Sequence, residues 1–365
     1  MHVPDGFIDT PVSLAAGVVA AAAVAVSLRG ARRELAGPSQ IGGSGTERTA
    51  PLAGLVAAFI FAVQMLNFPV AAGTSGHLLG GALAAILVGP YTGVLCVSVV
   101  LLMQGILFAD GGLTALGVNI SVMGVVTVVV AYAIFRGLLK VLPPTRRSVT
   151  AAAFTGALLS VPGAAAAFTA VYAVGGTTDV PLGKVFTAMV GVHTLIGIGE
   201  AAITAATVGA VIAVRPDLVH GARGLTTPLK LRIDGALVEV PAASAAAPAA
   251  AAGSTRKVWA TGLVTALVLA GFVSFYASAS PDGLEKVAAD KGIDQKVEEH
   301  AAAGSPLADY SVKDVDDARL SGGLAGVIGV GATVAVGTGI FWTVRRRRAE
   351  DRDPASTPSA ASPAG

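Results

Sequence analysis

The first two residues, Met1 and His2, place three kinds of nitrogen on consecutive atoms of the chain: an amine, a peptide nitrogen and an imidazole. The amine and the peptide nitrogen can close a five-membered chelate ring on a metal ion, and the peptide nitrogen with Nδ1 of His2 can close a six-membered one. Three nitrogens in one plane suit a square-planar ion such as Ni(II), with Co(II) as the alternative. A fourth nitrogen has to come from elsewhere in the chain.

The amine can bind a metal only if it is the N-terminus of the mature protein. No basic region, apolar run and small-residue cleavage site stand before His2, so we expect no cleaved signal peptide. A bulky residue at position 2 also disfavours removal of Met1. We therefore expect the Met1 amine to be a functional group.

His77 is the candidate for the fourth nitrogen. It lies in the run Thr74-Ser75-Gly76-His77-Leu78-Leu79-Gly80-Gly81, before an apolar segment. The glycines in this run allow another backbone to approach closely. A histidine at a helix end often only bonds a carbonyl, but the Met1-His2 start favours the interpretation that His77 is a metal ligand.

Two ionisable residues lie within a later apolar segment. His193 and Glu200 are seven residues apart and return to the same face of a helix. Such a pair at membrane depth marks a functional site, or else two hydrogen-bond partners that fix the geometry of the bundle. Both interpretations stay open.

Other polar residues are expected to support His77 or to join helices rather than to bind the ion directly. They are Asn67, Gln104 and Asn119, together with Gln64 and Asp110. His220 and His300 are expected to be solvated.

The elements that position these residues must lie in a membrane. Hydrophobic residues make up 53% of the chain and charged residues 13%, and the mean hydropathy is +0.72. A soluble domain has about 25% charged residues. Apolar stretches run over residues 11–28, 50–66, 78–108, 115–139, 149–174, 184–214, 258–279 and 322–344. Because Gly89-Pro90 divides the third stretch into two short helices, we predict an all-α polytopic bundle of about nine segments.

Charge placement predicts the orientation of this bundle. With the N-terminus outside and the segments alternating, the Lys and Arg residues near 29–33, 136–147, 215–232, 256–257 and 345–348 all lie in the cytoplasm. Met1, His2, His77 and residues 280–321 are then extracytoplasmic, and the C-terminus is cytoplasmic. The stretch 280–321 carries ten Asp or Glu against five Lys or Arg. Asp282 is expected to cap a short helix that starts near Gly283.

Composition also predicts the division into domains. We expect a seven-segment body over residues 1–235, an Ala- and Pro-rich linker over 236–257, a two-helix unit over 258–345 and a disordered tail over 346–365. The chain has one cysteine, no G-x-x-x-x-G-K-[ST] motif and no H-E-x-x-H motif. It therefore offers no disulfide framework, no P-loop for ATP and no such metalloprotease site.

Four stretches together carry a family resemblance: residues 1–7, 73–83, 108–117 and 193–200. They resemble the membrane substrate-binding (S) components of energy-coupling-factor transporters for cobalt and nickel, the CbiM and NikM family, over residues 1 to about 230. The run Pro281-Asp282-Gly283-Leu284-Glu285 and residues 305–310 resemble the small auxiliary component of that family.

The resemblance implies a planar N4 site made by the Met1 amine, the His2 amide and imidazole, and the His77 imidazole. It implies uptake of Ni(II) or Co(II) through the plasma membrane by a multi-pass protein that is not an enzyme and holds no resident cofactor. It also implies a transmembrane coupling protein and cytoplasmic ATPase subunits as partners, and no nucleic acid.

Two other classes remain open. The chain is alternatively a proton-coupled secondary metal transporter that uses His193 and Glu200 as a relay. A membrane enzyme with a metal cofactor is the third class, although no acid, base and nucleophile set converges in the sequence. Nickel and cobalt are not separated by the sequence, with a lean to nickel because a planar N4 set with a deprotonated amide suits a d8 ion.

Overall fold

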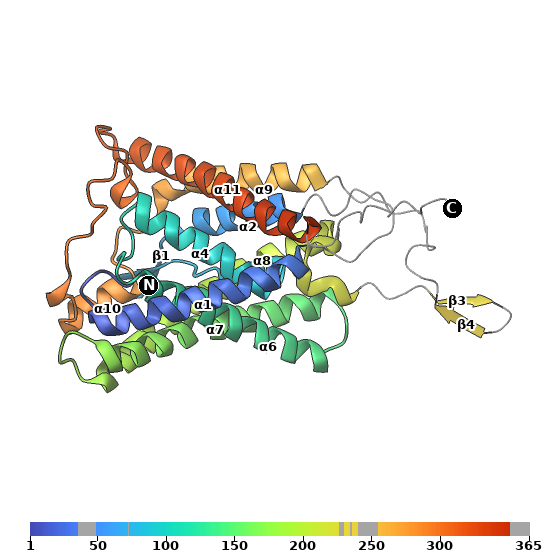
Figure 1. The fold of residues 1–365 in the computed structure, drawn as a ribbon, viewed down its shortest axis with the longest axis horizontal. Coiled ribbons are helices and arrows are strands. Elements are labelled where there is room, and N and C mark those ends of the chain that lie inside the picture. The colour runs from blue at the N-terminus through green and yellow to red at the C-terminus, as the bar shows by residue number, and fades with distance from the viewer. Residues whose placement is uncertain (36–48, 72, 226–229, 234–235, 240–254, 351–365) are drawn as a thin grey trace, which may run out of the picture.

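The computed structural model describes residues 1–35, 49–71, 73–225, 230–233, 236–239 and 255–350. Nearly all of the regular structure is helical (Figure 1). The helices are α1 (Thr10–Glu34), α2 (Thr49–Gln64), α3 (Gly81–Val88), α4 (Pro90–Leu107), α5 (Leu116–Asn119), α6 (Thr127–Val141), α7 (Arg146–Gly175), α8 (Leu182–Val214), α9 (Thr255–Gly271), α10 (Gly283–Lys291) and α11 (Ala318–Glu350). A π-helical segment, Ile120–Val126, joins α5 to α6.

Two short antiparallel hairpins complete the described structure. One pairs β1 (Phe68–Ala71) with β2 (Thr74–Gly76), and the other pairs β3 (Lys230–Ile233) with β4 (Ala236–Glu239). Within the described residues, seven helical stretches are long and apolar enough to cross a membrane. The prediction of an all-α polytopic membrane bundle is therefore confirmed.

Two of the predicted segments are shorter than a full crossing. The helix α2 has 16 residues and α3 has eight, and eight residues of helix are only about 12 Å long. The break predicted at Gly89-Pro90 is present, because Gly89 has a φ of 104° and Pro90 begins α4. The β1–β2 hairpin and residues 77–80 precede α3. The helix therefore begins inside the bundle, and all of its residues are buried.

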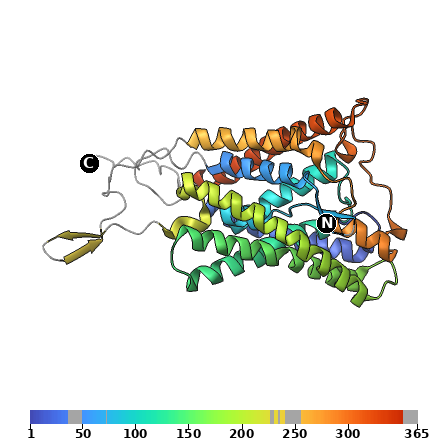
Figure 2. The same ribbon diagram turned by 180° about the vertical axis from the view of Figure 1, so that it is seen from behind.

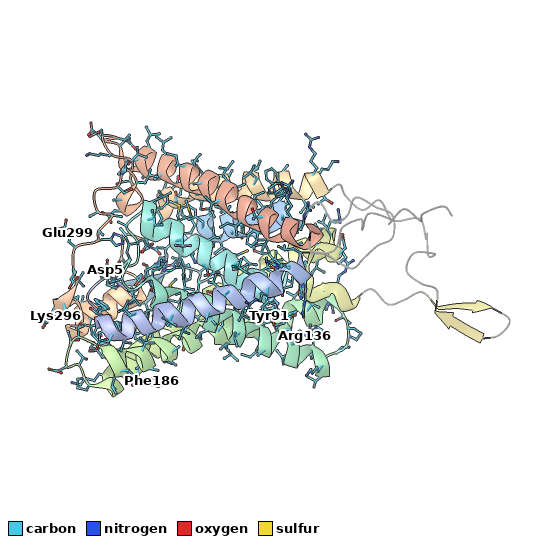
Figure 3. All side chains as sticks on the ribbon, in the orientation of Figure 1. Asp5, Tyr91, Arg136, Phe186, Lys296 and Glu299 are labelled. Atoms are coloured by element: carbon cyan, nitrogen blue, oxygen red, sulfur yellow. The ribbon has the colours of Figure 1, made fainter. Side chains whose placement is uncertain are left out.

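Contacts between helix ends show that α4 and α7 run antiparallel to α1. At one end, Glu34 of α1 accepts hydrogen bonds from Tyr91 N at 3.2 Å and Thr92 N at 2.7 Å, where α4 begins. At the other end, Asp9 N donates to Gly175 O of α7 at 2.7 Å. Figure 3 shows Asp5, Lys296 and Glu299 at this second end and Tyr91 and Arg136 toward the first. The orientation of the two ends in the membrane stays a prediction from the charge pattern.

The C-terminal helices pack along the body. Both α9 and α11 lie against α2 (Figure 1), and Trp259 Nε1 donates to Pro51 O at 3.1 Å. A Cβ at Gly54 would lie 2.8 Å from Thr338 N, so the absence of a side chain there lets α2 and α11 approach closely. The two-helix unit is thus joined to the body by side-by-side helix packing.

The acidic stretch 280–321 contains the expected capped helix. The Asp282 side chain accepts from Glu285 N, and the Glu285 side chain accepts from Asp282 N, which forms a capping box at the start of α10. The buried side chains of this helix are Leu284, Val287 and Ala288, and the helix packs against α8. Such a small apolar face is stabilised by the body it covers.

The expected linker and tail lie mostly outside the described residues. Residues 240–254 are not described, and β4 falls at the start of the predicted linker. The helix α11 continues to Glu350, so the chain is helical for five residues past the predicted start of a disordered tail at residue 346.

Candidate metal centre

The N-terminal segment is threaded into one end of the bundle. Met1, Val3 and Phe7 are all buried. Asn119 holds this segment as a neighbouring strand would: its Oδ1 accepts from Val3 N at 2.8 Å and its Nδ2 donates to Val3 O at 3.0 Å. The amide of Asn119 therefore fixes the backbone one residue after His2.

The Met1 amine reaches His77. The amine nitrogen lies 2.9 Å from Nε2 of His77, although 76 residues separate them in sequence. The His77 Nδ1 lies 3.0 Å from Leu78 O, so Nδ1 carries the proton and Nε2 presents its lone pair toward Met1. His77 is 6% exposed.

His2 completes the group. Its ring stacks on that of His77, with centroids 5.1 Å apart. Burial lowers the pKa of His2 to about 4, so the imidazole is neutral at pH 7. Its Nδ1 lies 3.1 Å from Asp110 Oδ1 and its Nε2 lies 3.1 Å from the Gln104 amide. A neutral ring donates from Nδ1 to Asp110, and the Gln104 amide satisfies Nε2 when its NH₂ group faces the ring.

A residue not named as a ligand candidate also touches this group. The Asp282 carboxylate pairs with the Met1 amine, and its Oδ2 lies 3.5 Å from His77 Nε2. Although burial opposes ionisation, the Met1 ammonium and His77 hold the pKa of Asp282 well below its usual range. One ligand atom each from His2, His77 and Asp282 lies within 4.8 Å of the others. The sequence feature that could have pointed to Asp282 is the Pro281–Glu285 signature, in which this aspartate caps the helix.

Glu200 supports the backbone that follows His77. Its two carboxylate oxygens accept from Leu79 N at 2.6 Å and from Gly80 N at 3.1 Å. These amides precede α3 and have no helical partner. Glu200 therefore positions the His77 loop rather than facing the ion.

His193 lies beside the same group. Its Nδ1 is 2.8 Å from Met189 O, and its buried Nε2 has no hydrogen-bond partner among the described residues. A small enclosed gap is lined by His193 together with Met1, His77 and Asp282. The structure thus brings His193 next to the candidate ligands, and His193 and Glu200 each bond to a backbone group.

A larger cavity opens beside the site, at the end of the bundle that carries the β1–β2 hairpin. Its volume is about 700 Å³, and its lining includes His2, His77, Asp282, Asn67 and Tyr310. Asn67 is one of the predicted supporting residues, and its Oδ1 is buried without a hydrogen-bond partner among the described residues. Figures 1 and 2 show the N-terminus beside α10 from both sides.

Comparison with known proteins assigns the two parts of the chain. Residues 2–218 match the family described as the cobalt uptake substrate-specific transmembrane region, CbiM, and residues 256–346 match the PDGLE domain. A putative metal transport protein of Haloquadratum walsbyi is 40% identical over 221 residues, which are 60% of this chain and 93% of that protein. A putative fused nickel transport protein, NikMN, of Archaeoglobus fulgidus is 38% identical over 222 residues, 60% of this chain and 68% of that protein.

A crystal structure of a transition metal transporter also resembles this fold, with a TM-score of 0.49 at 24% identity over 59% of this chain and 93% of that one. The CbiM match spans more than half of the chain, and the relatives are metal transport proteins. This protein therefore belongs to the CbiM family, carries a PDGLE domain at its C-terminal end, and is a multi-pass membrane transporter rather than an enzyme.

Proposed function

We propose that this chain is the substrate-binding component of an ATP-driven metal uptake transporter and holds Ni(II) or Co(II) in a planar N4 site. The four nitrogens are the Met1 amine, the His2 peptide nitrogen, His2 Nδ1 and His77 Nε2. One observation carries the proposal. Two nitrogens bound at right angles, about 2.0 Å from one ion, lie about 2.8 Å apart, and Met1 N and His77 Nε2 are 2.9 Å apart.

The surroundings of His2 support the same site. Because the ring is neutral at pH 7, Nδ1 can bind an ion once the ring proton has moved to Nε2. In this structure Nδ1 faces Asp110 at 3.1 Å, so Nδ1 would exchange Asp110 for the ion when the chelate forms. The Gln104 amide beside Nε2 can donate or accept after a flip and accommodates either tautomer.

Nickel is the ion that we favour. A planar N4 set that includes a deprotonated peptide nitrogen suits d8 Ni(II) better than Co(II). The fused relatives of Archaeoglobus fulgidus and Rhodobacter capsulatus are named as nickel transport proteins, and a relative of Clostridium tetani as a cobalt transport protein. Titration of the purified protein with both ions measures the preference, and tighter Co(II) binding would contradict it.

Partner subunits supply the energy in this proposal. The chain has no P-loop motif, so ATP would be hydrolysed by cytoplasmic ATPase subunits that act through a transmembrane coupling protein. The proton-coupled alternative has less support, because Glu200 accepts from two backbone amides next to His77 and is arranged as a structural group. Uptake that continues without ATPase subunits and stops when the proton gradient is collapsed would favour the alternative.

The N-terminus provides the sharpest test of the N4 site. One residue added before Met1 converts the amine into a peptide nitrogen and pushes it against buried neighbours. We expect metal binding to be lost, while the same residue added at the C-terminus has no effect. Titration calorimetry on both proteins decides the matter, and tight binding by the N-terminally extended protein would contradict the proposed ligand set.

A further inference from the structure

We propose that Asp282, from the PDGLE domain, is the counter-ion of the metal site and contributes directly to metal affinity. The inference rests on the proposed function, because it assumes an ion held by Met1, His2 and His77. Its observation is separate: the carboxylate pairs with the Met1 amine and lies 3.5 Å from His77 Nε2. A group that touches two of the proposed ligands borders the ion that they would share.

Charge explains why such a group is needed. Of the four proposed nitrogens, only the deprotonated peptide nitrogen is negative, so a divalent ion among them leaves one net positive charge. The site is buried, with Met1 3% and His77 6% exposed, and an uncompensated charge is costly in such surroundings. A carboxylate in contact with the ligands neutralises this charge.

The same carboxylate neutralises the site without an ion. The Met1 ammonium then carries the single positive charge, and Asp282 forms an ion pair with it. Binding the ion releases two protons to water, one from the amine and one from the peptide nitrogen. The net charge of the buried group is therefore zero before and after binding, and Asp282 can stay in place throughout.

A second carboxylate is less suited to this role. Asp110 lies 3.1 Å from His2 Nδ1, but its side chain is 27% exposed, against 11% for Asp282. Asp110 also accepts a hydrogen bond from the Tyr310 hydroxyl at 2.6 Å. Greater exposure to water and a second partner weaken its effect on a charge in the site.

Asp282 also borders the open side of the site. It lines both the cavity of about 700 Å³ and the small enclosed gap that contains Met1 and His193. The α10 helix fixes this position through its capping box and through Ser75, whose backbone N and hydroxyl donate to Pro281 O. The PDGLE domain thus supplies one charged group to a site whose four proposed ligands belong to the body.

The test removes this charge and keeps the shape. Asp282→Asn retains an N-cap acceptor for α10, and Asp282→Ser is a second neutral cap. We expect both variants of the full-length protein to raise the Kd for Ni(II) roughly tenfold or more. Glu299→Gln is the matched control, because Glu299 is an exposed acidic residue of the same domain and lines neither the cavity nor the gap beside His193. Its Kd should stay within about twofold of the parent.

The spectrum of the bound ion separates a counter-ion from a structural role. At saturating Ni(II), the absorption bands of the two neutral Asp282 variants should equal those of the parent, because the four nitrogens are unchanged. A third variant, Asp282→Glu, keeps the negative charge and should bind Ni(II) more tightly than the two neutral variants. Parent-like affinity in both neutral variants, or an altered spectrum, would overturn the counter-ion role. His77→Ala is measured alongside: if it binds as tightly as the parent, the N4 site itself is wrong.

Discussion

At the scale of single residues, the candidate ligands were identifiable because their chemistry is local. Met1 and His2 are adjacent, and His77 lies in a glycine-rich run. The structure adds the state of each nitrogen. The contact between His77 Nδ1 and Leu78 O fixes the tautomer that leaves Nε2 free to face Met1. A ligand whose other ring nitrogen is already held in this way loses little further freedom when it binds an ion.

Replacing His77 by Ala should separate binding from folding. Three nitrogens remain, with one open position, so we expect the Kd for Ni(II) to rise more than about a hundredfold. The helices should insert unchanged, because His77 lies outside the helical segments. Calorimetry with size-exclusion chromatography measures both quantities. Unchanged affinity and an unchanged planar spectrum would show that another group is the fourth ligand.

The stability of the protein should depend on the protonation of His2. Burial lowers its pKa from 6.5 to about 4, so between these values the unfolded chain binds a proton that the folded protein does not. Stability therefore rises with pH across this window, and is lost as pH falls, by up to about 3 kcal/mol. Thermal melting in detergent from pH 4 to 7 measures the slope. His2→Gln should flatten it, and an equal slope in both proteins would contradict the assignment.

At the scale of elements, two carboxylates perform the same task at the N-terminal ends of two different helices. Glu200 accepts from the amides of Leu79 and Gly80, just before α3, and Glu34 accepts from those of Tyr91 and Thr92, at the start of α4. Pro90 and its neighbouring Gly89 make the helix break predictable from sequence. The partners of Glu200 were not predictable. The helical period of the sequence shows on which face of α8 a side chain lies, but it does not show which part of the chain packs against that face.

This pair provides a controlled test of what positions His77. A glutamine has one acceptor oxygen, so Glu200→Gln leaves one buried amide short of a partner, at a cost of about 1–3 kcal/mol. We expect the Kd for Ni(II) to rise about tenfold as the His77 loop loosens. Glu34→Gln should lower the melting temperature without changing the Kd. Equal effects of the two substitutions on binding would show that Glu200 acts on stability alone.

At the scale of the whole molecule, the sequence indicated two units, and the structure shows where they meet. The membrane segments, the helix break and the capped α10 follow from local patterns of apolar residues, Gly-Pro and Asp-x-x-Glu. The contact between Met1 and Asp282 does not, because it joins residues 281 positions apart. It depends on how α10 packs on α8 and β2, which a composition shift cannot specify.

Deleting the residues after Pro241 should therefore affect binding and transport differently. All four proposed nitrogens remain, so we expect binding to persist, with a Kd raised roughly tenfold by the loss of Asp282. Transport should fall further. Titration and uptake assays on a folded truncation measure the two effects, and full transport would show that the PDGLE domain is dispensable.

The pairing of Met1 with Asp282 also determines the order in which the parts of the site are synthesised. Ribosomes add about 5–20 residues per second, so the partner of the Met1 amine is made roughly 15 to 55 seconds after Met1 itself. During that interval the N-terminal segment can already bind Asn119, but its amine lacks the buried carboxylate. The site that includes Met1 is thus among the last parts of the protein to be finished.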